Sequence, residues 1–253
     1  MNQAVSSDAA WRQLHHTACA PYKRAGRFAW HFARGKLGRD PVFRQLFEQG
    51  LLGSAAFARV VDIGCGQGLL ASLLDATRSV KAQWPSKWIR PPQLKHYTGI
   101  ELMPRDVARA NAALAGLENT PVLICQDMCE ALLPACDLVV ILDVLHYVDI
   151  AAQDRLLERV RDALAAGHAT RVDGTGRLLL RVGDAANQRG FAISQWVDRT
   201  VTRIRGHRVS PTWGRPLDAW VGMLERLGFA VQSLPMSQGT PFANVLLVAD
   251  LKP

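Results

Sequence analysis

The stretch that decides the fold reads Arg59-Val60-Val61-Asp62-Ile63-Gly64-Cys65-Gly66-Gln67-Gly68. Its first half is an apolar run that predicts a buried strand, and three glycines at alternate positions follow it. Glycine allows the backbone to turn sharply and to pass close to a ligand. Residues 69–74 then predict a helix. A strand, a glycine turn and a helix in this order predict a ligand site at the end of the strand.

The glycine spacing argues against two common phosphate-binding loops. The dinucleotide fingerprint requires glycine at the last position of G-x-G-x-x-G, and counting from Gly64 that position holds Leu69. The phosphate loop of nucleotide hydrolases requires Gly-Lys followed by Ser or Thr, and no such sequence follows the turn. The ligand is therefore expected to be neither a dinucleotide nor a nucleoside triphosphate held by its phosphates.

Short apolar runs alternate with helical stretches after the turn. Further strands are predicted at 97–101, 121–127, 137–143 and 177–182, with a helix at 104–117 and another after the fourth of all the strands. Near-continuous apolar strands joined by helices predict a parallel sheet covered on both faces. Two last strands, 229–234 and 244–251, have no helix between them and predict an antiparallel hairpin at the sheet edge. The predicted fold is α/β, a doubly wound, mostly parallel sheet of seven strands.

Two parts of the chain are not needed for the predicted seven-stranded fold. Residues 1–57 predict an N-terminal helical extension, in which Asp40-Pro41 is a good helix start because Asp caps free N–H groups and Pro suits the first turn. Residues 58–253 form the predicted main domain, with insertions at 79–96 and 183–216. Such insertions often carry substrate contacts, and they are equally often decoration.

The net charge of +8 over 253 residues is concentrated in two blocks. Residues 1–50 hold eight Lys and Arg against three Asp and Glu, and residues 171–215 hold nine against three. This segregation favours an anionic partner or substrate, and a merely solvated basic surface explains it equally well. The five cysteines form no CxxC pair, so neither a disulfide framework nor a metal site is expected. With no secretory signal or membrane span in the sequence, we predict a cytoplasmic protein.

The nonapeptide from Val60 to Gly68 closely resembles the first motif of class I S-adenosylmethionine-dependent methyltransferases. The strand order that follows is similar to theirs, and the resemblance covers roughly residues 58–182 together with the terminal helix and hairpin. It implies a Rossmann-like methyltransferase fold with S-adenosylmethionine as the cofactor. Residues 1–57 lie outside the general family pattern.

The resemblance also implies a role for each matching position. The methionine part of the cofactor would be bordered by the turn, through Asp62, Gly64, Cys65, Gly66 and Gly68. Both ribose hydroxyls would donate to Glu101, the adenine would pack on Leu102, and its amino edge would meet Asp127 and Met128. Cofactor and acceptor would meet at Asp143, where the fourth strand ends. Any one of these carboxylates could instead cap the next helix, but three at successive strand ends favour cofactor binding.

The sequence says less about the molecule that accepts the methyl group. After the fourth strand the chain reads Asp143-Val144-Leu145-His146-Tyr147, which lacks the Pro-Pro-Tyr type of sequence common in methylation of amino groups of bases or amides. His146 is a candidate general base and, with Asp143, a candidate catalytic residue; a structural residue starting the next helix is the alternative. Weaker candidates are Tyr22, His31, Asp184 and His207.

Three stretches are similar to a bacterial methyltransferase subgroup associated with biosynthesis of aryl-polyene-type pigments: residues 22–43, which open Tyr22-Lys23-Arg24, the run Leu178-Leu179-Leu180-Arg181-Val182-Gly183-Asp184-Ala185, and the Trp84-Pro85 insertion. That resemblance implies O- or C-methylation of a small aromatic acceptor, free or carried by an acidic acyl carrier protein. Two other hypotheses remain open at this stage. One is an RNA methyltransferase, and the other is a non-catalytic partner that contacts a membrane through the aromatic and basic N-terminal helix.

Overall fold

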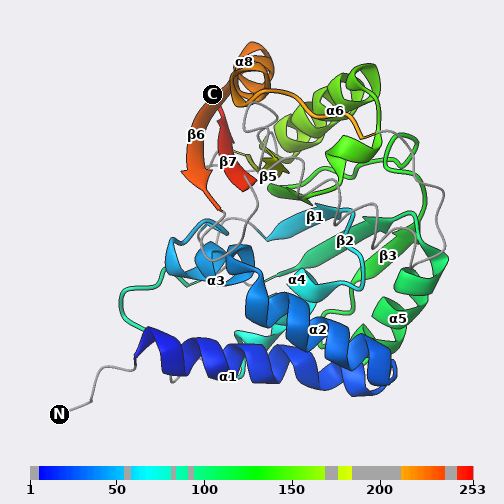
Figure 1. Cartoon of the computed structure of the whole chain (residues 1–253), viewed down its shortest axis with the longest axis vertical. Helices are drawn as coiled ribbons and strands as arrows, with labels where there is room; N and C mark the ends of the chain where they lie inside the picture. Colours follow the sequence, from blue (N-terminus) through cyan, green and yellow to red (C-terminus); the bar gives the residue numbers. More distant parts are fainter. Residues whose placement is uncertain are drawn as a thin grey trace.

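The computed structural model describes residues 6–53, 58–80, 84–90, 94–168, 176–183, 212–236 and 244–252. Within these residues seven strands form one sheet in the order β3-β2-β1-β4-β5-β7-β6 (Figure 1). Their bounds are Arg59–Ile63 for β1, His96–Glu101 for β2, Val122–Cys125 for β3, Leu138–Leu142 for β4, Arg177–Gly183 for β5, Phe229–Pro235 for β6 and Asn244–Leu251 for β7.

Strands β1 to β5 pair in parallel, whereas β7 runs antiparallel to both β5 and β6. This arrangement confirms the predicted mostly parallel sheet with an antiparallel edge hairpin.

Helices cover both faces of the sheet (Figure 1). On one face lie α4 (Leu69–Ala76) and α5 (Pro104–Leu114), and the N-terminal helices α1 (Ser7–Cys19), α2 (Arg27–Arg39) and α3 (Pro41–Glu48) pack with them in one hydrophobic core. On the other face lie α6 (Ile150–His168) and α8 (Leu217–Arg226). Short 3-10 helices, η1 (Ala20–Lys23) and η3 (Leu145–Tyr147), join these elements.

The central strands send alternate side chains into the two cores. In β4, Leu138 and Val140 join the core on the α4 side, while Val139 and Ile141 join the core on the α6 side. This is the two-residue period of a strand, and it explains the near-continuous apolar runs of the sequence.

The N-terminal helices are tied closely to the main domain. Leu14 and Leu37 are completely buried in the core that α4 shares, and each such side chain stabilises the fold by about 2 kcal/mol. The hydroxyl of Ser72 in α4 donates to the Ala18 carbonyl at 2.7 Å. The predicted start at Asp40 is present, since its carboxylate accepts from the Val42 N–H at 3.2 Å.

Two predicted boundaries differ from the structure. The third strand was expected to run to residue 127 and ends at Cys125, because the Gln126 N–H bonds the Glu101 carbonyl and the chain then turns. The helix expected over 104–117 ends at Leu114, with turn-type bonds beyond it.

The described residues include most of the first predicted insertion and little of the second. In the described part of the first, Trp84 packs edge-on against Trp88 and against Phe47 of α3, so this part joins the helical layer. In the second, residues 184–211 lie outside the described residues.

Candidate active site

The glycine turn at the end of β1 is open at one residue. Gly64, Gly66 and Gly68 all have positive φ, at 74°, 55° and 71°. A methyl group on Gly64 would collide with Val144, and one on Gly68 would collide with Leu114. A methyl group on Gly66 would meet nothing within 4 Å. The backbone at Gly66 is therefore the place where a ligand can approach the turn.

Glu101 lies against this opening, at the end of β2. Its carboxylate accepts from the Gly66 N–H at 2.9 Å and from the Met103 N–H at 2.9 Å. Burial raises the pKa of Glu101, although these backbone N–H bonds oppose the effect. Each carboxylate oxygen can accept a second bond, so the group still suits a vicinal diol such as a ribose. The structure thus brings together two elements that the sequence separates by 34 intervening positions.

The residues expected to meet the adenine are close to Glu101. Leu102 follows it directly and is 59% exposed, which leaves an apolar surface available to a flat ring. The main chain joins Gln126 to Glu101 at 3.1 Å and so places Asp127 and Met128 at the neighbouring strand end. Asp127 accepts from the Cys129 N–H at 2.8 Å within a turn, so it does not cap a helix as the alternative interpretation expected. Contact of these side chains with adenine stays a prediction.

Asp62 is buried beneath the turn. The Tyr97 hydroxyl donates to its carboxylate, and only 5% of the residue is exposed. Burial raises the pKa of Asp62 to about 7, with the Tyr97 hydrogen bond opposing and the charge of Glu101 adding to the rise. Its expected role beside the methionine part of the cofactor stays a prediction.

The N-terminal extension supports the turn from below. The hydroxyl of Tyr22, which is completely buried, donates to the Gln67 carbonyl at 2.8 Å. The Gln67 side chain in turn donates to Asp106 in α5 at 3.0 Å. Tyr22 therefore holds the glycine turn rather than facing a ligand. Sequence reasoning did not identify Gln67 or Asp106, because neither carries a motif of its own.

Asp143, just beyond β4, is held by a charged network. Arg181 of β5 donates from Nε to Asp143 Oδ1 at 2.8 Å and from Nη2 to Oδ2. The same guanidinium donates to both oxygens of Asp40, at 2.5 and 2.6 Å. Sequence reasoning missed Arg181 as a site residue; the available signal was a basic residue inside the apolar run of 177–182.

His146 lies in η3, three residues beyond Asp143. Its carbonyl accepts from the Trp213 N–H at 2.8 Å, and its ring centre is 4.1 Å from that of Tyr147. The side chain of Gln153 in α6 bonds the carbonyls of Leu145 and Trp213 and so fixes both segments. Among the weaker candidates, His31 is exposed on the outer helix α2, and Asp184 and His207 lie outside the described residues.

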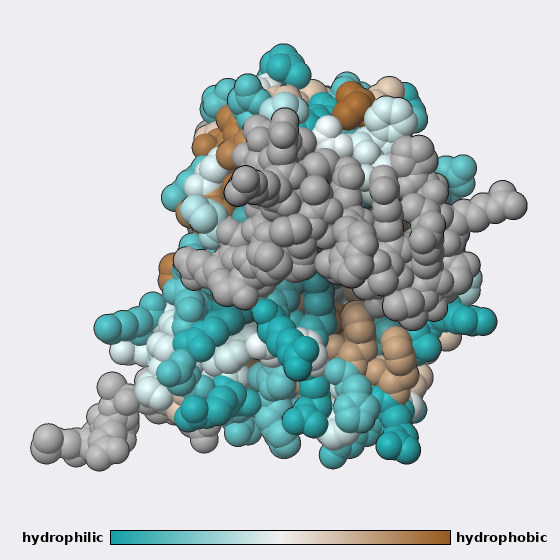
Figure 2. Space-filling model, in the orientation of Figure 1, coloured by the Kyte–Doolittle hydropathy of each residue, from teal (hydrophilic) through white to brown (hydrophobic). Residues whose placement is uncertain are grey.

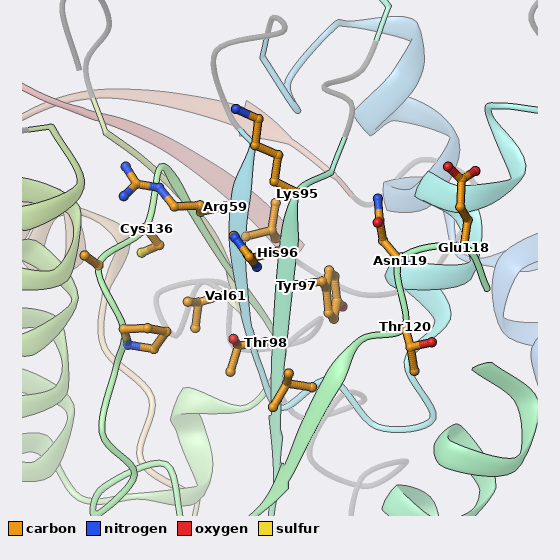
Figure 3. A pocket seen from close by; sticks show the side chains of 14 residues that line it. Arg59, Val61, Lys95, His96, Tyr97, Thr98, Glu118, Asn119, Thr120 and Cys136 are labelled. Carbon is orange, nitrogen blue, oxygen red and sulfur yellow. The ribbon is translucent and has the colours of Figure 1, made fainter. Parts of the chain in front are cut away.

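A cavity of about 470 Å³ lies at the opposite, amino-terminal edge of the sheet. Figure 3 shows Arg59 and His96 at the first residues of β1 and β2, Lys95 just before β2, and Glu118 and Asn119 across from them. None of the residues expected to bind cofactor lines this cavity.

Within the described residues, no group of three or more His, Cys, Asp or Glu side chains is arranged to hold a metal ion. None of the described helices is both long and apolar enough to cross a membrane.

Comparison with known proteins agrees with this geometry. Residues 61–167 match the model of a family described as a methyltransferase domain. A search of curated protein sequences found no match. The chain thus contains a region similar to a methyltransferase domain within a methyltransferase-like fold, and the glycine turn with Glu101 fits S-adenosylmethionine as the cofactor.

Solved methyltransferases share the fold at low identity. Magnesium protoporphyrin IX methyltransferase from Synechocystis PCC 6803, with bound S-adenosylhomocysteine, is 16% identical with a TM-score of 0.56, covering 98% of this chain and 100% of its own. Mitomycin 7-O-methyltransferase is 23% identical, with a TM-score of 0.53, and the match covers 98% of this chain and 73% of that protein. An O-methyltransferase of neocarzinostatin biosynthesis, in complex with S-adenosylmethionine and 2-hydroxy-5-methyl naphthoic acid, is 20% identical with a TM-score of 0.52, covering 98% and 69%.

Proposed function

We propose that the protein methylates a hydroxyl group of a small aromatic acid. The observation that carries this proposal is the position of His146, beside the end of β4 and joined through its main chain to Trp213. Val144 contacts the glycine turn, so the segment that carries His146 begins at the cofactor site. The aromatic rings of Tyr147 and Trp213, both more than 40% exposed, offer apolar surface in the same segment.

The chemistry needs few groups from the protein. Bound S-adenosylmethionine supplies an electrophilic methyl group. His146 accepts the proton of the acceptor hydroxyl at a ring nitrogen, and the oxygen becomes a better nucleophile. Most of the remaining catalysis is alignment of the acceptor, which the fixed main chain of η3 provides. Asp143 is less suited to accept a proton, because Arg181 already donates to both of its oxygens.

The basic N-terminal surface supports an acceptor that is attached to an acyl carrier protein. Residues 9–39 contain seven Lys and Arg and no Asp or Glu. Arg27, His31, Arg34 and Arg39 are exposed there, and the surface seen over α1 and α2 is mostly hydrophilic (Figure 2). Such a surface suits an acidic carrier protein, since opposite charges steer association.

The test uses the purified full chain, labelled S-adenosylmethionine and a panel of hydroxylated aromatic carboxylic acids, each free and attached to an acyl carrier protein. Label is expected in at least one acid. The variant His146→Ala is expected to lower kcat by about 100-fold, with affinity for S-adenosylhomocysteine unchanged. His96→Ala, an exposed histidine at the opposite sheet edge, is the matched control and should keep full activity.

Two results would contradict the proposal. Transfer of label to RNA, with none to any acid in the panel, would assign the protein to a different acceptor class. Full kcat in the His146→Ala variant would show that His146 is not the general base, and would leave the proposed acceptor standing.

A further inference from the structure

Asp143 is held in an unfavourable backbone conformation. Among the described residues it is the single non-glycine residue with a positive φ, at 60°. This conformation is strained for a residue with a side chain, so it persists only where surrounding contacts determine it. The two bonds from Arg181 are such contacts, because they fix the carboxylate in a bidentate pair.

Arg181 is shared between two carboxylates. Only 2% of its side chain is exposed, and its guanidinium bridges Asp143 to Asp40, the N-cap residue of α3. Burial opposes ionisation of Asp40, but hydrogen bonds from Arg181 and its charge hold the pKa of that carboxyl well below its usual range. Asp40 is therefore charged at neutral pH. On its outer side it pairs with Lys36 at 2.7 Å, whose side chain is 40% exposed and so screened by solvent.

The network ends at Asp143, whose chain neighbour Val144 lies against the glycine turn. A methyl group on Gly64 would lie within 3 Å of Val144, the residue after Asp143. A third of the Asp143 side chain is exposed, in contrast to the buried guanidinium behind it. Asp40, Asp143 and Arg181 together carry one net negative charge, which the more exposed Lys36 partly offsets from the outer side of Asp40. Without Asp40, Arg181 would neutralise Asp143 completely.

We propose that Asp40 and Arg181 are positioning residues for the methyl donor. Arg181 orients the Asp143 carboxylate beside the glycine turn, and Asp40 offsets the charge of Arg181, so that Asp143 attracts a cationic ligand. S-adenosylmethionine carries a positive sulfonium, whereas its product S-adenosylhomocysteine carries a neutral thioether. The network therefore favours the donor over the product and weakens product inhibition. This inference rests on the cofactor of the proposed function and not on its acceptor.

The test measures the affinities of the full chain for S-adenosylmethionine and S-adenosylhomocysteine by calorimetry, with no acceptor present. Asp40→Asn keeps a good helix cap and removes the charge. It should weaken binding of the donor by about fivefold and change binding of the product less than about twofold. Asp143→Asn should do the same. Arg181→Lys keeps the charge but loses the planar guanidinium that bonds both carboxylates. It should also reduce the preference for the donor over the product.

A double variant shows whether Asp40 acts through Asp143. In the Asp143→Asn background, Asp40→Asn should weaken donor binding no further, because the carboxylate that it supports is already neutral. The matched control is Asp250→Asn. Asp250 pairs with Arg177, four residues earlier on β5, at 2.7 and 2.9 Å, and Arg177 also reaches the Leu51 carbonyl. That variant should lower the thermal unfolding temperature but change neither affinity.

Three outcomes would overturn the inference: equal weakening of donor and product by Asp40→Asn, a full further loss in the double variant, or the same loss in Asp250→Asn. Thermal unfolding of each variant shows that the protein measured is folded. If the wild type methylates no aromatic acid but shows the expected affinity shifts, the proposed acceptor is wrong and the role of Asp40 and Arg181 stands.

Discussion

The two edges of the sheet both hold an Arg–Asp pair, and the pairs differ in use. At the amino edge, Arg59 donates to both oxygens of Asp137, whose side chain is 2% exposed. At the carboxyl edge, Arg181 does the same for Asp143, whose side chain is 33% exposed. Asp137 also accepts from the Arg59 main-chain N–H at 2.8 Å, so its bonds are used within the fold. The same type of ion pair thus leaves the carboxylate buried at one edge and partly exposed at the other.

The two edges also differ in the groups that they bring together. The hollow at the amino edge gathers side chains that face solvent, such as Lys95 and His96 (Figure 3). The carboxyl edge gathers main-chain N–H groups, carboxylates and an open glycine around one point. Convergence of polar groups, more than hollow space, identifies the site.

The largest effect should come from breaking the pair at the amino edge. Asp137→Asn leaves a partly buried guanidinium without its charged partner and should lower the free energy of unfolding by about 3 kcal/mol. Affinity for S-adenosylmethionine should stay within about twofold, since the glycine turn lies at the opposite edge. Denaturant unfolding and calorimetry measure the two quantities. A parallel loss of affinity would show that the edges are not independent.

The second effect contrasts two glutamates. Glu101→Ala removes the expected ribose acceptor and the partner of the Gly66 N–H, and should weaken cofactor binding by about 100-fold, or about 3 kcal/mol. Glu118→Ala, at the amino-edge cavity, should leave binding unchanged. Calorimetric titration with S-adenosylhomocysteine distinguishes them. Equal affinities in the two variants would place the ribose elsewhere.

A smaller effect should follow from loosening the turn. Tyr22→Phe leaves the Gln67 carbonyl without its buried donor and should lower the free energy of unfolding by about 1 to 2 kcal/mol. Binding of S-adenosylmethionine should weaken in the same variant, because the turn is less fixed. Tyr147→Phe, with a half-exposed ring, serves as control for stability. Unchanged stability in Tyr22→Phe would mean that the extension does not hold the turn.

The smallest effect is a pH dependence. The pKa of Asp62 is about 7 in the folded protein against 3.8 for the free side chain. The folded state therefore holds a proton that the unfolded state has lost, and stability falls as pH rises through 7. Between pH 6 and 8 the wild type should lose about 1 kcal/mol relative to Asp62→Asn. Parallel stability curves for the two proteins across this range would show that Asp62 is already ionised.

Much of the site was predictable because its residues are set by local sequence. The glycine turn must follow β1, and a carboxylate at a strand end must lie at the carboxyl edge of a parallel sheet, so Glu101 could be placed despite the intervening insertion. The partners of these groups could not be predicted. Tyr22 and Gln67 are 45 positions apart, and Asp40 and Arg181 are 141 apart. No periodicity connects such pairs.

The sequence alone determined the strands, the glycine turn and the edge hairpin, because these follow from apolar periodicity and from the backbone freedom of glycine. The type of cofactor followed from the resemblance of that turn to a known methyltransferase motif. Tertiary structure alone decided that the N-terminal extension contacts the glycine turn and Arg181. Tyr22 and Asp40 reach the turn and Arg181 only when α1 to α3 bury their apolar faces against α4. The physical reason is that the hydrophobic effect is non-directional. The apolar pattern of α1 to α3 therefore predicts which side chains are buried, but not which part of the chain they pack against or which polar groups that packing brings together.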